Sequence, residues 1–151
     1  MKKRRAPKAL KPFELIEHTA DIGVRAFGKT PQQLFINAAK GMFFLIARRK
    51  RAAKKSVLQQ TVNVDVVAGN AEELLVSWLS ELLAVSDSNN LFFTHFHILR
   101  LTDTALKAQA DAEPFNTTDH VLAAQVKAVT YHRLSIKREG GVLQAEVIFD
   151  I

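Results

Sequence analysis

The chain has 151 residues, of which 48% are hydrophobic, and its formal net charge is +6 at pH 7. This length suits one domain with a sizeable core, and the apolar content excludes a wholly disordered chain. Because the sequence has no cysteine, disulfide frameworks, thiolate catalysis and cysteine-based zinc or iron–sulfur sites are excluded. No stretch approaches the roughly 18 apolar residues of a membrane span, so we expect a cytoplasmic protein without a membrane partner.

The positive charge is concentrated in two runs. Twelve of the 21 Lys and Arg residues lie within residues 2–11 and 48–55. Such runs can contact RNA phosphates or an acidic partner, or they can be a solvated tail and a solvated linker. We expect residues 1–12 to form a basic, disordered tail, residues 13–151 to form a single domain, and residues 48–55 to be a linker.

The first elements of the domain are two strands and a helix. Phe13 to Glu17 and Ile22 to Phe27 are predicted to be short strands joined through a polar segment. Thr30 and Gln33 then form a T-x-x-Q capping box with a proline at the first helical position. Apolar residues recur after it at helical spacing, which predicts a core-facing helix over Pro31 to Ala47.

A strand, a helix and another strand follow. Alternating valines from Val62 to Val66 predict a half-buried strand. Asn70 caps the next helix, which carries a dense apolar stripe from Leu74 to Leu83. We expect this helix to end in a turn at Asp87 to Asn90, and the Phe- and Ile-rich segment Leu91 to Leu101 to be a strand.

The remaining elements are predicted to be strands. Leu106 to Ala112 alternates between small apolar and polar residues, and a loop from Glu113 to Asp119 follows. The last two strands, Val126 to Lys137 and Val142 to Phe149, are separated by the hairpin signal Glu139 to Gly141. Two helices inserted among many strands favour an α+β fold with a mostly antiparallel sheet.

The C-terminal segment suggests a cation site. Asp150 and the main-chain carboxylate of Ile151 supply two hard oxygen donors side by side, which suits a divalent cation. Asp21 is the candidate for a third donor because it lies in an unusual polar segment of an apolar run. Asp150 alternates away from the apolar face of the final strand, so an ordinary exposed aspartate at a strand end is the competing interpretation.

Four ordered segments resemble a known family. They are EHTADIG at residues 17–23, NAAKGMF at 37–43, VKAVTYH at 126–132 and VIFDI at 147–151. Together they resemble the archease family, small proteins that assist the RtcB-type RNA-splicing ligase. The resemblance extends from Phe13 to Ile151 and implies strand-helix-strand-strand modules with two main helices on one face of the sheet.

The resemblance also implies roles for particular residues. It makes Asp21, Asp150 and the carboxylate of Ile151 a metal-binding group, for Ca²⁺ or alternatively Mg²⁺ or Mn²⁺. Lys127 is either a solvated cation or a contact for a partner or nucleotide, and we expect it to share a strand face with Val129. No residue is assigned a catalytic role.

Several neighbouring polar residues receive a structural interpretation. His18 and Thr19 are expected to support the first polar loop, although a catalytic or ligand role for His18 stays open. Tyr131 and His132 are expected to pack across the final hairpin. The other histidines, His95, His97 and His120, have no metal-ligand spacing, so a zinc site is not expected.

The function implied by the resemblance is that of a non-enzymatic accessory factor. It would promote GTP-dependent guanylylation of an RtcB-type RNA ligase and its multiple turnover in tRNA splicing or RNA repair. The main alternative is a basic RNA-binding module with a structural metal site, which would act through the two cationic runs. A metal-dependent hydrolase using His18 and Asp21 is a weaker alternative, since it needs a pocket and a positioned water.

Overall fold

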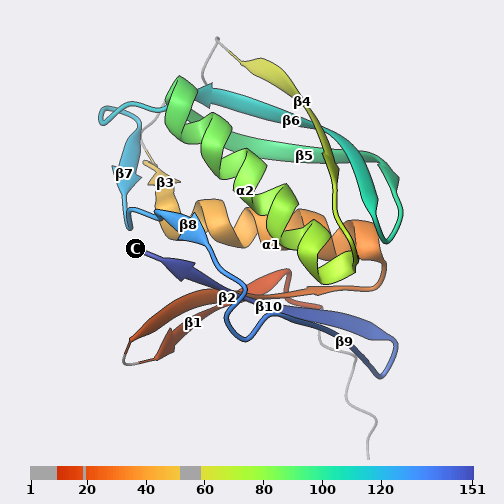
Figure 1. Ribbon diagram of the computed structural model, residues 1–151. Coiled ribbons are helices and arrows are strands. Elements are labelled where there is room, and N and C mark those ends of the chain that lie inside the picture. Colours follow the sequence, from red (N-terminus) through yellow and green to blue (C-terminus); the bar gives the residue numbers. More distant parts are fainter. Residues whose placement is uncertain (1–9, 19, 52–58) are drawn as a thin grey trace, which may run out of the picture.

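Two helices packed between antiparallel sheets form the fold (Figure 1). The computed structural model describes residues 10–18, 20–51 and 59–151. Most of the expected basic tail, the residue Thr19 and part of the expected linker therefore lie outside the described residues. The elements, in chain order, are β1 (Phe13–His18), β2 (Asp21–Gly28), α1 (Pro31–Ile46), β3 (Ala47–Arg49), β4 (Gln60–Val67), α2 (Ala71–Asn89), β5 (Leu91–Leu101), β6 (Ala105–Pro114), β7 (His120–Leu122), β8 (Ala128–Val129), β9 (Ser135–Glu139) and β10 (Val142–Asp150).

The strands form two main sheets. The first has the order β1-β2-β10-β8, with β9 also paired to β10, and the second has the order β4-β6-β5. Strands β3 and β7 form a separate short pair. All these pairings are antiparallel. The expected α+β fold is thus confirmed, but the helices lie between two sheets because each sheet has its own apolar face to cover.

Both helices begin at the predicted caps. The Thr30 hydroxyl accepts a hydrogen bond from the Gln33 backbone N–H (3.2 Å), and the Asn70 side chain accepts one from the Glu73 N–H (2.9 Å). These bonds satisfy N–H groups that the first helical turn leaves without partners. Helix α2 continues through the expected turn to Asn89 and stops at Asn90, which adopts a left-handed conformation with φ 53°.

The core forms where the helices meet the sheets. Helix α1 contacts strands of both main sheets, and α2 packs mainly on β4 and also contacts β5 and β8. Trp78 is fully buried on α2 and donates its indole N–H to the carbonyl of Phe35 on α1 (3.0 Å). On β10, Leu143, Ala145, Val147 and Phe149 are all buried as predicted, and Ile148 between them is buried as well.

The predicted strand from Val126 to Lys137 is wrong. Only Ala128–Val129 and Ser135–Glu139 are strands, and the segment between them leaves the sheet. The Thr130 hydroxyl donates to the Ile148 carbonyl (2.9 Å) and Arg133 takes a positive φ of 54°, so the chain turns here. The following hairpin is confirmed, with positive φ at both Gly140 and Gly141.

A buried acid–histidine pair joins the β3–β7 ribbon to the rest of the core. Glu113 and His120 are 1% and 2% exposed, and the His120 Nε2 atom lies 2.9 Å from the Glu113 carboxylate. The imidazole contacts the rings of Phe92 and Phe115, with centroid distances of 4.8 and 5.2 Å. The Arg49 Nε atom lies 3.6 Å from the same carboxylate. Glu113 is therefore held by both His120 and Arg49.

We predict that His120→Ala destabilises the protein by about 3–5 kcal/mol, because it leaves the Glu113 carboxylate buried without its closest partner. Urea unfolding followed by circular dichroism measures the change. His95→Ala removes an exposed imidazole and serves as the control, with an expected change below about 0.5 kcal/mol. Equal stability of the two variants would contradict the assignment of Glu113 and His120 as a structural pair.

Candidate metal centre

The pairing of β2 with β10 brings two of the predicted metal ligands to the same end of one sheet. The last registered pair between these strands is Phe149 with Ile22. Asp150 and Asp21 are each the next residue beyond that pair, on adjacent antiparallel strands. The register therefore places the two carboxylate-bearing residues opposite one another, although 128 positions separate them in the sequence.

Gly23 allows the two strands to approach closely beside this pair. It is registered with Ile148, and a Cβ atom added at Gly23 would collide with the backbone carbonyl oxygen of Val147. The missing side chain thus keeps β10 tight against β2 two residues from Asp21. This is a physical reason for the glycine in the segment from Asp21 to Gly23.

Strand β8 and the loop after it complete the surroundings. The Lys127 backbone N–H donates to the Asp150 carbonyl (2.7 Å), and Ala128 is registered with Asp150. The loop then brings His132 back towards β2, where its Nε2 atom lies 3.8 Å from the Asp21 carboxylate. The expectation that His132 packs across the final hairpin did not include this contact.

Nearby positive charge on the sheet is already paired. Arg25 lies on the same strand face as Asp21, and it donates to Glu14 (2.7 Å) and Glu146 (2.6 Å) on the neighbouring strands. The hydrogen bond to Glu14, followed by that to Glu146, raises the pKa of the Arg25 guanidinium. This cross-strand triad stabilises the sheet, but it leaves Arg25 without a free charge for Asp21 and Asp150.

The carboxylates at the end of the sheet are open to solvent. The Asp21 side chain is 30% exposed, Asp150 is exposed, and Ile151 is 52% exposed. Among the described residues, the Asp150 carboxylate has neither a hydrogen bond nor an ion pair to a side chain. Within all the residues that the structure describes, no group of three His, Asp or Glu side chains is arranged so that it could hold a metal ion. The main-chain carboxylate of Ile151 is the third predicted donor at this end of the sheet.

These donors fit a hard divalent cation. Carboxylate oxygens are the ligands that Ca²⁺ and Mg²⁺ prefer, and an exposed site leaves room for water to complete the coordination shell. The donor set is therefore consistent with the predicted group, and binding itself stays a prediction.

The other candidate residues are placed differently from expectation. Lys127 is exposed while Val129 is buried, so the prediction that they share a strand face is wrong. The reason is that Lys127 precedes the two-residue strand β8 and does not belong to a long strand. His18 pairs with Asp21 through the β1–β2 register, but its side chain and Thr19 lie outside the described part. His95 and His97 are exposed on β5.

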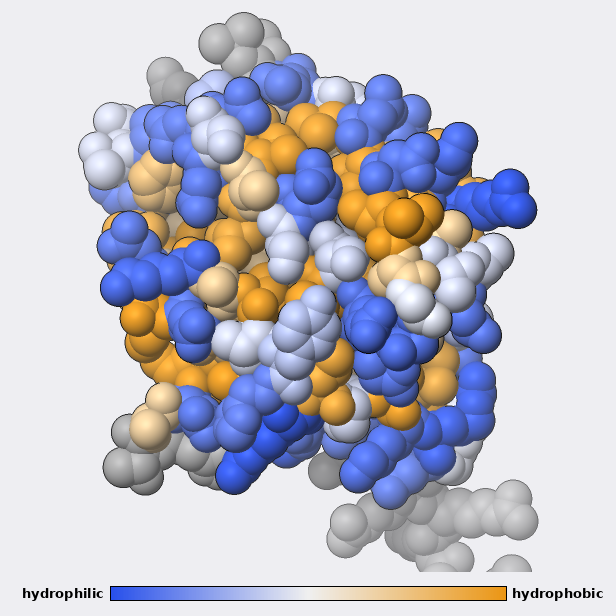
Figure 2. All heavy atoms as spheres, in the orientation of Figure 1, coloured by the Kyte–Doolittle hydropathy of each residue, from blue (hydrophilic) through white to orange (hydrophobic). Residues whose placement is uncertain are grey.

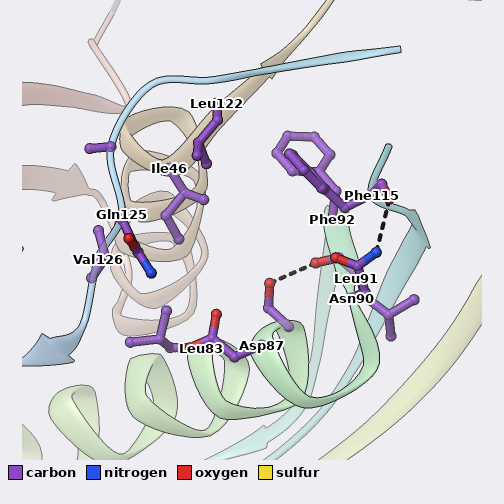
Figure 3. A pocket seen from close by; sticks show the side chains of 12 residues that line it. Ile46, Leu83, Asp87, Asn90, Leu91, Phe92, Phe115, Leu122, Gln125 and Val126 are labelled. Atoms are coloured by element: carbon purple, nitrogen blue, oxygen red, sulfur yellow. Dashed lines mark hydrogen bonds between the residues drawn. The ribbon is translucent and has the colours of Figure 1, made fainter. Parts of the chain in front are cut away.

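A small pocket lies along the segment that leads to Lys127. Its volume is about 270 Å³, and it is lined mainly by the C-terminal half of α2, the start of β5, Leu122 and residues 124–126 (Figure 3). Two of its polar side chains are already bonded: the Ser86 hydroxyl donates to the Leu91 carbonyl (2.6 Å), and the Asn90 amide donates to the Phe115 carbonyl (3.1 Å). Asp87 and Gln125 are the other polar residues that line it. Figure 2 shows apolar surface between hydrophilic side chains on this side of the molecule.

The fold and the pair of aspartates define a class of small α+β proteins in which the last strand, β10, pairs with the second strand, β2. The profile of the archease protein family (MTH1598/TM1083) matches residues 13–151. The chain belongs to this family.

Relatives and solved structures agree. The chain is 32% identical to the protein archease of Methanosarcina mazei over 96% of this chain and 99% of that protein, and 34% identical to that of Pyrococcus abyssi over 94% and 100%. The solution structure of Methanobacterium thermoautotrophicum protein 1598 superposes with a TM-score of 0.71 at 30% identity, covering 94% of this chain and 100% of that one. An archease from Thermotoga maritima, described as a possible chaperone, has the same fold, with a TM-score of 0.58 at 19% identity and full coverage of both chains. No helix in the described residues is long and apolar enough to cross a membrane.

We predict that Asp21→Asn weakens Ca²⁺ binding at least tenfold, because it removes one of two facing carboxylates. Isothermal titration calorimetry measures the affinity, and a rise in melting temperature with Ca²⁺ reports binding to the folded state. Asp103→Asn, an exposed aspartate on the β5–β6 turn, is the matched control. Adding two glycines after Ile151 tests the main-chain carboxylate, and undiminished binding in that variant would remove it from the ligand set.

We also predict that Gly23→Ala lowers the free energy of unfolding by about 1–3 kcal/mol and weakens Ca²⁺ binding, because the strands must separate to admit the methyl group. Urea unfolding and calorimetry give the two quantities. Gly69→Ala is the control, since its added Cβ meets only the movable end of the Glu73 side chain. If Gly23→Ala behaves like the control, close packing at Gly23 does not position the carboxylates.

Proposed function

We propose that this protein is a metal-binding accessory factor that activates an RtcB-type RNA ligase in the cytoplasm. It promotes the GTP-dependent guanylylation of the ligase, and thereby multiple turnover in tRNA splicing or RNA repair. Membership of the archease family supports an accessory role. The observation that carries the proposal is the convergence of Asp21 and Asp150 at one open end of the sheet.

The position of these carboxylates suits contact with another protein. They lie at a strand end and not in an enclosed cleft, so a partner can reach them and a bound ion together. Asp21, Asp150 and the carboxylate of Ile151 would hold the cation, and the cation would supply positive charge for oxygen ligands of the partner or of a nucleotide. Lys127, exposed beside Asp150, adds a second positive charge on the same edge.

Two modes of action are compatible with this arrangement. In the first, the factor delivers a divalent cation to the ligase. In the second, the acidic end and Lys127 hold the ligase in the conformation that accepts GTP and metal. Neither mode requires a bond to be made or broken by this chain, which is why we propose an activator and not an enzyme.

We predict that Asp21→Ala abolishes stimulation of the ligase, because both modes depend on this carboxylate. The measurement is multiple-turnover ligation of an RNA substrate with GTP, with formation of the guanylylated ligase followed in parallel. Excess Mn²⁺ rescues the variant only in the delivery mode. Asp103→Ala is the control and keeps full stimulation. An Asp21→Ala protein that stimulates like the wild type would refute both modes.

A further inference from the structure

A groove runs along helix α1 between the edges of the two main sheets. Strand β1 is at the edge of the first sheet and β5 at the edge of the second, and α1 contacts both strands. Two adjoining cavities of about 540 and 470 Å³ form the groove, and they share Lys40 and Phe96. It is lined by different residues from the carboxylate end of the sheet described above.

The floor of the groove follows from the spacing of residues on α1. Leu34, Ala38 and Met42 face the core and are buried. The opposite stripe, at intervals of three or four residues, is Gln33, Asn37, Lys40 and Phe44, followed by Arg48 just after the helix. A helix whose second stripe combines amide, cationic and aromatic groups presents a surface for a ligand that has both charged and flat apolar parts.

The charges that line the groove are cationic. Lys29, Lys40 and Arg48 line it, and within residues 10–18, 20–51 and 59–151 none of them forms an ion pair with a carboxylate. No aspartate or glutamate lines either cavity. His95 and His97 lie at one end, exposed on β5. This distribution is complementary to an anionic ligand.

The same groove exposes an aromatic surface. Phe44 is 40% exposed, and its ring lies 5.4 Å from that of Phe13 at the β1 edge. The Arg48 guanidinium lies over the Phe44 ring at 4.2 Å from its centroid. A guanidinium held on an aromatic ring is a flat, cationic platform, and nucleobases stack on platforms of this kind.

We propose that this groove binds single-stranded nucleic acid. The phosphates contact Lys29, Lys40 and Arg48, and a base stacks on the Arg48–Phe44 platform. A duplex hides the faces of its bases, so only an unpaired strand can use the charges and the platform together. An acidic peptide would use the charges but not the stacking surface. The proposal does not depend on ligase activation.

The test is fluorescence anisotropy of a labelled 12-nucleotide single-stranded RNA titrated with the full-length protein at several salt concentrations. The double variant Lys40→Gln/Arg48→Gln is expected to weaken binding about tenfold and to reduce the slope of log affinity against log salt by about 1.4, since each phosphate contact on a single strand contributes about 0.7. Phe44→Leu, which leaves the charge unchanged, is expected to weaken binding about fivefold or more.

The control is Lys137→Gln/Arg138→Gln, which removes the same charge from the exposed strand β9 on the side of the sheet away from β1. Its affinity should change less than twofold, because neither Lys137 nor Arg138 lines the groove. Circular dichroism confirms that all variants fold. The proposal is overturned if the control loses as much affinity as the groove variant, if Phe44→Leu has no effect, or if duplex RNA or polyglutamate competes as well as the single strand.

Discussion

The antiparallel pairing of β2 with β10 is the constraint on which the rest of the structure depends. It places the end of the chain in the middle of the first sheet, between β2 and the strands β8 and β9. The buried face of β10 completes the core against α1, and the opposite face carries Glu146 into the ion pair with Arg25. The same register sets Asp150 beside Asp21. Stability and the candidate metal centre are thus two results of one set of backbone hydrogen bonds.

The molecule presents two chemically opposite regions. The strand ends near Asp21 and Asp150 carry oxygen donors suited to a cation, and the groove on α1 carries cationic and aromatic groups suited to an anion. They are built from different elements, because the first depends on sheet register and the second on the exposed stripe of a helix. The candidate metal centre and the proposed nucleic-acid groove therefore share no side chain.

Local patterns predicted most of the fold. Caps at Thr30 and Asn70, the valine alternation of β4 and the glycine turn before β10 are each encoded within a few residues, and the structure confirms them. The pairing of β3 with β7 and the break between β8 and β9 were not predictable this way. They depend on bonds to distant groups, such as that of Thr130 to the Ile148 carbonyl. The closeness of Asp21 to Asp150 likewise comes from register, and His132 was missed because a tertiary turn positions it.

The insertion of β10 beside β2 has a consequence for biosynthesis. A ribosome makes β2 long before β10, so the central ladder of the first sheet cannot close until the whole segment between these strands has been synthesised. Contacts of such long sequence separation form slowly, and β2 keeps an unpaired edge in the meantime. Strand β2 is accordingly exposed to mispairing until β10 has been synthesised, and Asp150 can lie beside Asp21 only after that.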